Sequence, residues 1–218
     1  MNQIAPNAKA VDRPRLLLFP GSMRAASHHR RLVDYFAARL GTICTCDVLL
    51  PGEVDLPLFN QDLEQDPGVL ARVRALHRRI AAADGLIVAS PEYNGHVSPY
   101  VKNTLDWISR LQRIDPETAG LNPFRDKPLL LASASTGWTG GVLGLQNARS
   151  ILGYLGAFVV GEQICVCDAD AWCQGDAFVF EPAFAVHIDR VLAEFVLRVD
   201  RLRQGARTGI EGEATRHA

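Results

Sequence analysis

Five short apolar runs, separated by helical patterns, constrain the fold of this 218-residue chain more than any other feature. The runs are almost continuously apolar, which is typical of strands that are buried on both faces of a sheet. They predict strands over residues 15–19, 42–50, 85–90, 128–133 and 157–166. The segments between them carry apolar residues at helical spacing and predict helices over 28–40, 67–83, 98–111, 141–156 and 182–203. This alternation predicts repeated βαβ units and a parallel sheet.

Right-handed crossovers between such units predict an α/β three-layer sandwich with a five-stranded parallel sheet in the order 2-1-3-4-5, the order of flavodoxin-like folds. In sheets of this kind, ligands bind outside the carboxyl ends of the strands, at the point where the strand order reverses. We therefore expect the chemistry in the loops that follow the first, third and fourth strands.

The sequence predicts one domain. No Gly/Ser-rich or Pro-rich linker interrupts its middle, so a domain over 15–204 is expected between disordered tails at 1–14 and 205–218. The polar start has no apolar signal-peptide core, and no run is long enough to cross a bilayer. A net charge of −1 argues against binding to nucleic acid or to anionic membranes, which needs clustered Lys and Arg. These features predict a cytoplasmic protein.

Five cysteines, an odd number in a chain without a secretory signal, predict reduced thiols. Four of them form Cys-x-Cys pairs in strand-like runs, where residues two apart share one face of a strand. Metal sites favour the Cys-x2-Cys spacing instead, so a structural role is favoured and no metal site is predicted. The cysteines are Cys44, Cys46, Cys165, Cys167 and Cys173.

The loop after the first strand combines a glycine, two hydroxyls and an arginine, in the segment Pro20-Gly-Ser-Met-Arg-Ala-Ala-Ser27. The start of the next helix supplies free N–H groups and a positive dipole end, which together favour an anion. Ser22 and Ser27 can donate hydrogen bonds to phosphate oxygens, and Arg24 adds charge. The alternative is an ordinary capped helix with an exposed arginine. The loop lacks Gly-x4-Gly-Lys-[Ser/Thr] and Gly-x-Gly-x-x-Gly, which argues against nucleoside triphosphate hydrolysis and a Rossmann dinucleotide site.

Two further loops follow the third and fourth strands. The loop after the third strand, the second of the three, contains Pro91-Glu-Tyr-Asn-Gly95. Its Asn-Gly pair favours a tight turn with exposed amides that could hold a flat heteroaromatic ring. The loop after the fourth strand, the third of the three, is Ser135–Gly141. It has three glycines within five positions, which indicates close approach by a ligand or by backbone. Each loop alone could be an ordinary turn, but three such loops at one sheet edge favour a ligand site.

The same segments resemble the NADPH-dependent FMN reductase family, which includes quinone, chromate and azo-dye reductases with a flavodoxin-like fold. The resemblance covers roughly residues 15–206, and its most specific part is Pro-Glu-Tyr-Asn joined to Lys-Asn-x-x-Asp-Trp. The matching segments are Gly21-Ser-Met-Arg-Ala-Ala-Ser27, Asp55-Leu-Pro-Leu-Phe-Asn-Gln-Asp62, Ser90-Pro-Glu-Tyr-Asn-Gly95, Ser98-Pro-Tyr-Val-Lys-Asn-Thr-Leu-Asp-Trp107 and Ser135-x-Gly137-x-x-Gly140-Gly141.

The resemblance implies that the first loop holds the phosphate of FMN and that the second lines the isoalloxazine and ribityl chain, largely through backbone groups. It implies that the third loop closes the other side of the ring. The implied cofactor-binding residues are Ser22, Arg24, Ser27, His29, Pro91, Glu92, Tyr93, Asn94, Gly95, Ser135 and Gly137. The family usually has Asn where this chain has His29. A protonated imidazole beside the phosphate would make FMN affinity depend on pH. Lys102, Asn103, Asp106 and Trp107 are assigned to helix packing and interfaces rather than to catalysis.

For function, the resemblance implies ping-pong transfer of hydride from NADPH or NADH through FMN to a small acceptor: a quinone, an azo compound, a metal oxyanion or free flavin. No catalytic side chain is required, and His96 is assigned to shaping access rather than to donating a proton. The resemblance also implies a homodimer or homotetramer whose neighbouring subunit covers the flavin. Trp138 and Tyr100 are candidate interface aromatics, or are packed within the monomer. An FMN-binding electron carrier or sensor without nicotinamide turnover is the alternative. Carriers are usually strongly acidic, which this chain is not.

Overall fold

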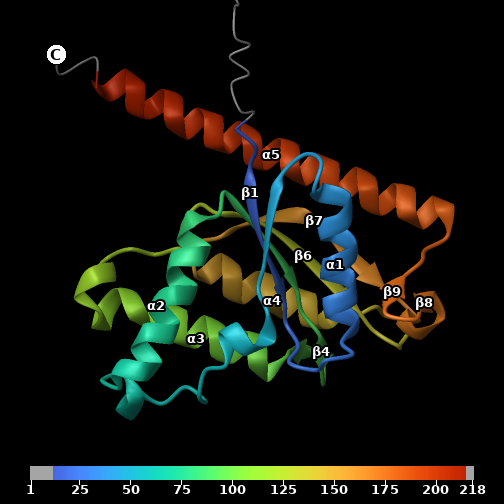
Figure 1. Cartoon of the computed structure of the whole chain (residues 1–218), viewed down its shortest axis with the longest axis horizontal. Helices are drawn as coiled ribbons and strands as arrows, with labels where there is room; N and C mark the ends of the chain where they lie inside the picture. Colours follow the sequence, from blue (N-terminus) through green and yellow to red (C-terminus); the bar gives the residue numbers. More distant parts are fainter. Residues whose placement is uncertain (1–11, 215–218) are drawn as a thin grey trace, which may run out of the picture.

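A five-stranded parallel sheet lies at the centre of the molecule, in the order β2-β1-β3-β6-β7 (Figure 1). The computed structural model describes the backbone of residues 12–214 and the side chains of residues 12–205. The strands are β1 (Arg15–Pro20), β2 (Thr45–Val48), β3 (Gly85–Ala89), β6 (Pro128–Ala134) and β7 (Phe158–Val166). This order confirms the predicted 2-1-3-4-5 topology and the α/β class.

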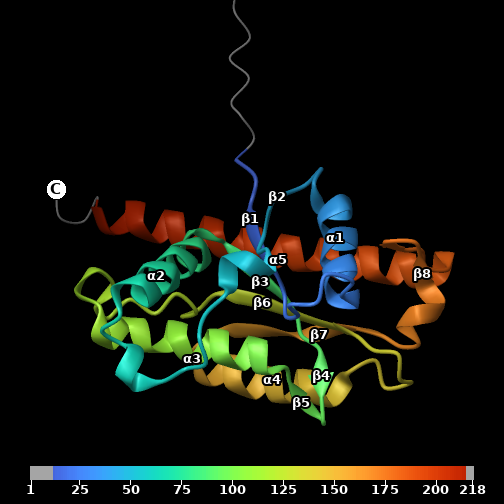
Figure 2. The ribbon, with the colours of Figure 1, turned by 60° about the horizontal axis from the view of Figure 1, so that its bottom comes forward.

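Helices cover both faces of the sheet. The helices are α1 (His28–Leu40), α2 (Pro67–Ala82), α3 (Pro99–Ile114), α4 (Val142–Tyr154) and α5 (Pro182–Ala214). Figure 2 shows α5 along one side of the sheet and α3 and α4 along the opposite side. Successive residues of β1 alternate between two cores: Leu16 packs with α1 and α5, whereas Leu17 packs with α2, α3 and α4. Burial on both faces explains why the strands are uninterrupted apolar runs.

The helix starts follow local capping signals. The side chains of Ser27, Asp66 and Ser98 accept hydrogen bonds from backbone N–H groups in the first turns of α1, α2 and α3. Such caps satisfy donors that the helix itself leaves free. The bounds of α1 match the predicted helix over 28–40.

Two short antiparallel hairpins were not predicted. One pairs β4 (Glu92–Tyr93) with β5 (His96–Val97), and the other pairs β8 (Cys173–Gln174) with β9 (Ala177–Phe178). Strands of two residues are too short to produce an alternating pattern. Short 3₁₀ helices in the connections are η1 (Pro51–Val54), η2 (Gln61–Leu63), η3 (Pro116–Thr118) and η4 (Ala169–Trp172).

The predicted disordered tails are revised where the structure describes them. At the N-terminal side, the Pro14 carbonyl accepts a hydrogen bond from the Thr45 N–H, and Asp12 forms an ion pair with Arg203. At the other end, α5 continues as helix to Ala214 instead of ending near residue 203. The part of α5 beyond residue 203 contains glycines, each of which costs a helix about 1 kcal/mol relative to alanine without ending it. It contains no proline. Residues 1–11 and 215–218 lie outside the described part of the chain.

Among the helices of the described residues, none combines the length and the apolar character that crossing a bilayer requires.

Candidate functional site

The loops after β1 and β3 meet at the carboxyl edge of the sheet. The Gly21 N–H donates to the Ala89 carbonyl at 2.8 Å, and the Ser98 hydroxyl donates to the Gly21 carbonyl at 2.8 Å. A Cβ atom on Gly21 would lie only 2.4 Å from Cγ2 of Val101. Only glycine therefore fits where the first loop passes the start of α3.

The first loop presents a set of hydrogen-bond donors. Ser22 Oγ accepts from the Arg24 N–H at 3.3 Å, and Ser27 Oγ accepts from two N–H groups in the first turn of α1. Each hydroxyl keeps its own O–H to donate, and Arg24 is exposed. With the positive end of the α1 dipole, these groups suit an anion with several oxygens, such as a phosphate.

His29 departs from its predicted place. Its side chain is 5% exposed, and its Nε2 accepts a hydrogen bond from the Ala134 N–H at 3.2 Å, at the end of β6. The ring thus points into the sheet and not into the loop. Burial, and to a smaller extent the neighbouring His28, lower the pKa of His29 to about 3, although a hydrogen bond with Ser90 acts in the opposite direction. The protonated imidazole that was expected beside a phosphate is therefore not available at neutral pH.

The second loop is the β4–β5 hairpin. Asn94 and Gly95 have φ angles of 53° and 74°, as the two central residues of a type I′ turn require. This explains the Asn-Gly pair. Pro91 is buried at the base of the hairpin, whereas Tyr93 is 48% exposed at its side and His96 is exposed opposite it.

Glu92 fastens this hairpin to α4. Its Oε2 accepts a hydrogen bond from the Gly144 N–H at 2.8 Å, in the first turn of α4, where the preceding Gly141 offers no side-chain cap. Asn147 Nδ2 donates to the Gly95 carbonyl at 2.8 Å. The prediction placed Glu92 beside a cofactor largely through backbone groups, and the structure shows that its carboxylate caps a helix from a distant part of the chain.

Replacing Glu92 with alanine is expected to lower the free energy of unfolding by about 1–2 kcal/mol, because the α4 start loses both an acceptor and a favourable charge. Glu92→Gln retains a hydrogen-bond acceptor, so this variant is expected to lose less than half of the free energy of unfolding that the alanine variant loses. Urea denaturation followed by circular dichroism measures both variants. An alanine variant as stable as the parent would contradict the capping role.

The third loop uses its glycines in different ways. Gly141 has a φ of 83°, and a Cβ on it would lie 2.1 Å from Ser133 Oγ. A Cβ on Gly140 would lie 3.1 Å from Cys167 Sγ. The predicted close approach is therefore made by the protein itself at these two positions. Gly137 is exposed, and its N–H donates to Ser135 Oγ at 3.1 Å.

An open groove of about 350 Å³ lies beside the first loop. Ser22 and Arg24 line one side of it, and Tyr93 and the 81%-exposed Leu58 contribute apolar surface. The groove therefore joins the donors of the first loop to apolar and aromatic groups, a combination that suits a ligand with a charged end and a flat ring.

The wall of the groove that contains Leu58 is held by α3. Asn103 Oδ1 accepts from the Phe59 N–H at 2.7 Å, and its Nδ2 donates to the Pro57 carbonyl at 3.0 Å. The Trp107 Nε1–H donates to the same carbonyl at 2.8 Å. Trp107 is fully buried, which confirms its assignment to packing.

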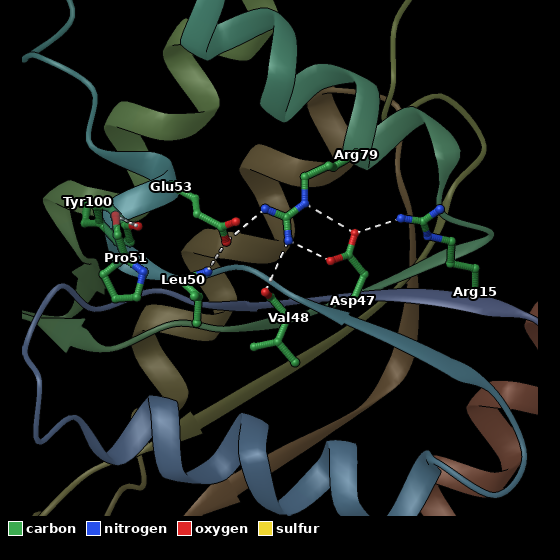
Figure 3. Close-up of polar contacts among 8 residues, drawn as sticks. All are labelled: Arg15, Asp47, Val48, Leu50, Pro51, Glu53, Arg79 and Tyr100. Carbon is green, nitrogen blue, oxygen red and sulfur yellow. Dashed lines mark hydrogen bonds and ion pairs between the residues drawn. The ribbon is translucent and has the colours of Figure 1, made fainter.

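A network of charges fixes the chain just before this wall (Figure 3). The Arg79 guanidinium lies between Asp47, at 2.6 Å, and Glu53, at 2.9 Å, and Arg15 contacts the other oxygen of Asp47 at 3.1 Å. Hydrogen bonds, chiefly from Arg79, hold the pKa of Asp47 below its usual value; the Leu50 N–H and Arg79 do the same for Glu53. Sequence reasoning missed this network, whose members come from β1, β2, η1 and α2.

Tyr100 belongs to the same region (Figure 3). Its hydroxyl donates to the Pro51 carbonyl at 3.4 Å, and its ring packs against Phe19 with the ring centroids 5.5 Å apart. Burial raises the pKa of this hydroxyl. Tyr100 is therefore packed within the subunit, which is the second of the two places predicted for it, whereas Trp138 is 83% exposed.

All five cysteines are free thiols. Within residues 12–214, no three or more His, Cys, Asp or Glu side chains gather as a metal site would require.

Comparison with known proteins agrees with the arrangement of the loops. The family model described as NADPH-dependent FMN reductase matches residues 14–171. A quinone reductase of Escherichia coli (strain K12) is 38% identical over 113 residues, which are 52% of this chain and 56% of that protein. A 2-hydroxy-1,4-benzoquinone reductase of Burkholderia sp is 30% identical over 141 residues, 65% of this chain and 71% of that protein. The chain thus spans about half the length of the first of these relatives.

Among solved structures, a flavoenzyme NAD(P)H:(acceptor) oxidoreductase from Paracoccus denitrificans matches with a TM-score of 0.73 and 24% identity, over 86% of this chain and 98% of that one. An azoreductase from Bacillus anthracis matches with a TM-score of 0.54 and 15% identity, over 86% and 99% of the two chains. At these identities the similarity is one of fold.

Proposed function

This chain belongs to the NADPH-dependent FMN reductase family, and from this premise we propose that it binds FMN and passes hydride from NADPH or NADH to a quinone. The observation that carries the proposal is the meeting of the loops after β1 and β3 at the carboxyl edge of the sheet, beside a groove that combines phosphate donors with aromatic surface. This is where a sheet of this order binds its ligand.

The residues present fit FMN. Ser22, Ser27 and Arg24 would hold its phosphate at the start of α1, since they offer two hydroxyls and a guanidinium next to free backbone donors. Tyr93 and the β4–β5 hairpin would border the ring, with Ser135–Gly137 on its other side. When bound, FMN supplies the hydride-accepting and hydride-donating centre, so the chain needs no nucleophile of its own. The residues of the chain would bind FMN, orient it and shape the access of substrates to it.

A quinone is the proposed acceptor class. Two of the relatives described above are named quinone reductases, and the groove is open enough for a flat ring to reach the same surface as the nicotinamide. A ping-pong order follows because one face serves both substrates in turn. A cytoplasmic location stays a prediction from the sequence.

The function is tested by an anaerobic titration of the FMN-loaded protein. We expect NADPH to bleach the flavin absorbance promptly and 1,4-benzoquinone to restore it. A protein that binds FMN but is not bleached would fit a carrier or sensor. Failure to bind FMN would contradict the proposal.

Arg24→Gln is expected to weaken FMN binding by about tenfold, since a charge-assisted hydrogen bond to phosphate contributes about 1.5–3 kcal/mol in a protected site and less where exposed. Arg125→Gln removes the same charge from an exposed position before β6, at the amino edge of the sheet, and should leave the dissociation constant unchanged. Quenching of FMN fluorescence measures both. Equal weakening in the two variants would point to a general charge effect rather than a phosphate contact.

We also propose that the chain forms a homodimer or homotetramer. Trp138 in the third loop and Tyr154 at the end of α4 are 83% and 92% exposed, and large exposed aromatics favour protein interfaces. Sedimentation equilibrium tests this, and a monomer at micromolar concentration would contradict it.

A further inference from the structure

Three side chains outside this site form an array next to the start of α1. Nδ1 of His28, the first residue of α1, lies 3.6 Å from Sγ of Cys173, the first residue of β8. Nε2 of the same ring lies 3.0 Å from Oδ1 of Asp170 in η4. Figure 1 shows β8 and β9 beside α1. A thiol, an imidazole and a carboxylate in this order are the arrangement that activates a nucleophile.

The carboxylate fixes the state of the imidazole. Because Asp170 can only accept a hydrogen bond when ionised, it places the ring hydrogen on Nε2 and leaves Nδ1 as an acceptor that faces the thiol. The ring is also held by Phe178, which stacks on it with centroids 6.0 Å apart and an interplanar angle of 23°. His28 is thus oriented both at its far nitrogen and on its face.

The sulfur also has a positive neighbour. Nη1 of Arg31 lies 3.7 Å from Cys173 Sγ. This guanidinium and the nearby start of α1 both favour negative charge on the sulfur as its proton leaves. The Ala169 carbonyl, at 3.3 Å, competes with His28 for the S–H. The Cys173 side chain is partly exposed, so a small reagent can reach it.

The other four cysteines lack this environment. Within the described residues, none of them has a histidine among its hydrogen-bond partners. The hydrogen bond between Cys44 and Cys46 raises the pKa of the Cys44 thiol and lowers that of the Cys46 thiol, and burial raises the pKa of Cys165. Cys173 lies beyond residues 14–171, which the family model matches, whereas His28 and Asp170 lie within them.

We propose that Cys173 is a nucleophilic thiol that reacts with conjugated carbonyl electrophiles, the class that includes quinones, with His28 as its base. The S–H proton passes to His28 Nδ1 while the sulfur forms a bond to the alkene carbon. The π electron pair moves to the carbonyl oxygen, which takes the proton back. With a quinone, the carbon that now bears sulfur loses its hydrogen as a proton and the second carbonyl oxygen gains one, so the product is a hydroquinone thioether. No leaving group or outside oxidant is involved. Only the choice of quinones rests on the proposed function.

The test uses the full chain as purified, without NADPH. Substoichiometric N-ethylmaleimide is added at pH 7, and peptide mass spectrometry follows the labelling of each cysteine with time. We expect Cys173 to react at least about tenfold faster than each other cysteine. His28→Gln and Asp170→Asn should slow Cys173 by about tenfold and several-fold respectively. His187→Gln, a change at an exposed histidine of α5, is the control and should not change the rate.

Circular dichroism verifies that each variant is folded. If both folded variants label Cys173 as fast as the parent, Cys173 is merely accessible and the proposal is overturned. Equal labelling of all five cysteines would also overturn it. Incubation with 1,4-benzoquinone should add one quinone to the Cys173 peptide, and its absence there would overturn the assignment to quinones. Labelling needs neither FMN nor nicotinamide, so its failure is distinguishable from failure of the proposed reductase activity.

Discussion

Replacing Trp107 with alanine is expected to lower the free energy of unfolding by about 3–5 kcal/mol, as large-to-small changes at buried aromatic positions do. Trp107 is fully buried in the core between the sheet and α2, α3 and α4. Its ring meets Phe59 edge-on, with centroids 5.0 Å apart, and its Nε1–H satisfies the Pro57 carbonyl. The alanine variant leaves a cavity and removes the only indole donor to that carbonyl.

Trp138→Ala is the matched control for stability. Trp138 is 83% exposed, so the same substitution should change the free energy of unfolding by less than about 0.5 kcal/mol. Guanidinium denaturation followed by circular dichroism measures both variants. Similar losses for the two would contradict the packing described for Trp107.

The Trp107→Ala substitution is also expected to affect the wall of the groove. Asn103 and Trp107, one turn apart on α3, together hold the backbone of residues 57–59. With Trp107 removed, Asn103 alone holds the wall that carries Leu58. We therefore expect the folded Trp107→Ala protein to bind FMN more weakly than the Trp138→Ala protein, although Trp107 does not line the groove.

The sequence was sufficient to predict features that depend on local signals. The continuous apolar runs of β1 and β3 predicted a sheet buried on both faces, and Ser27 and Ser98 predicted the starts of α1 and α3. The Asn94-Gly95 pair predicted a tight turn because both residues tolerate a positive φ. Each of these signals lies within a few residues of the structure that it specifies.

The features that could not be predicted depend on distant residues. Arg79 and Asp47 are 32 positions apart, and His28 and Cys173 are 145 apart, so no spacing rule reveals either contact. Glu92 was assigned to a cofactor largely through backbone groups, and no local signal indicated that its carboxylate caps a helix through Gly144, 52 positions away. The sequence identified the loops and their place at one edge, whereas the direction of each side chain is set by the packing of the whole domain.

His29 shows this difference most clearly. A histidine at the start of a helix beside a phosphate loop suggested a charged ring, but the ring is turned inward and bonded to the end of β6. Burial holds its pKa at about 3 in the folded chain, against 6.5 for an exposed histidine. The unfolded chain therefore binds a proton at position 29 below about pH 6.5, while the folded chain does not until about pH 3. Stability from this residue is fully present above pH 6.5 and is lost as the pH falls toward 3.

His29→Asn is therefore expected to flatten the acid side of the stability profile. Asparagine keeps a hydrogen-bonding side chain and cannot titrate, so the parent should lose about 2–3 kcal/mol more than the variant between pH 7 and pH 4, with a slope of up to about 1.4 kcal/mol per pH unit. Urea denaturation at a series of pH values measures this, and His187→Asn, on the exposed face of α5, should follow the parent. Parallel curves for parent and His29→Asn would mean that the pKa of His29 is the same in the folded and the unfolded chain. In that case the ring would be charged beside the phosphate loop below about pH 6.5, and the affinity for FMN would be expected to depend on pH.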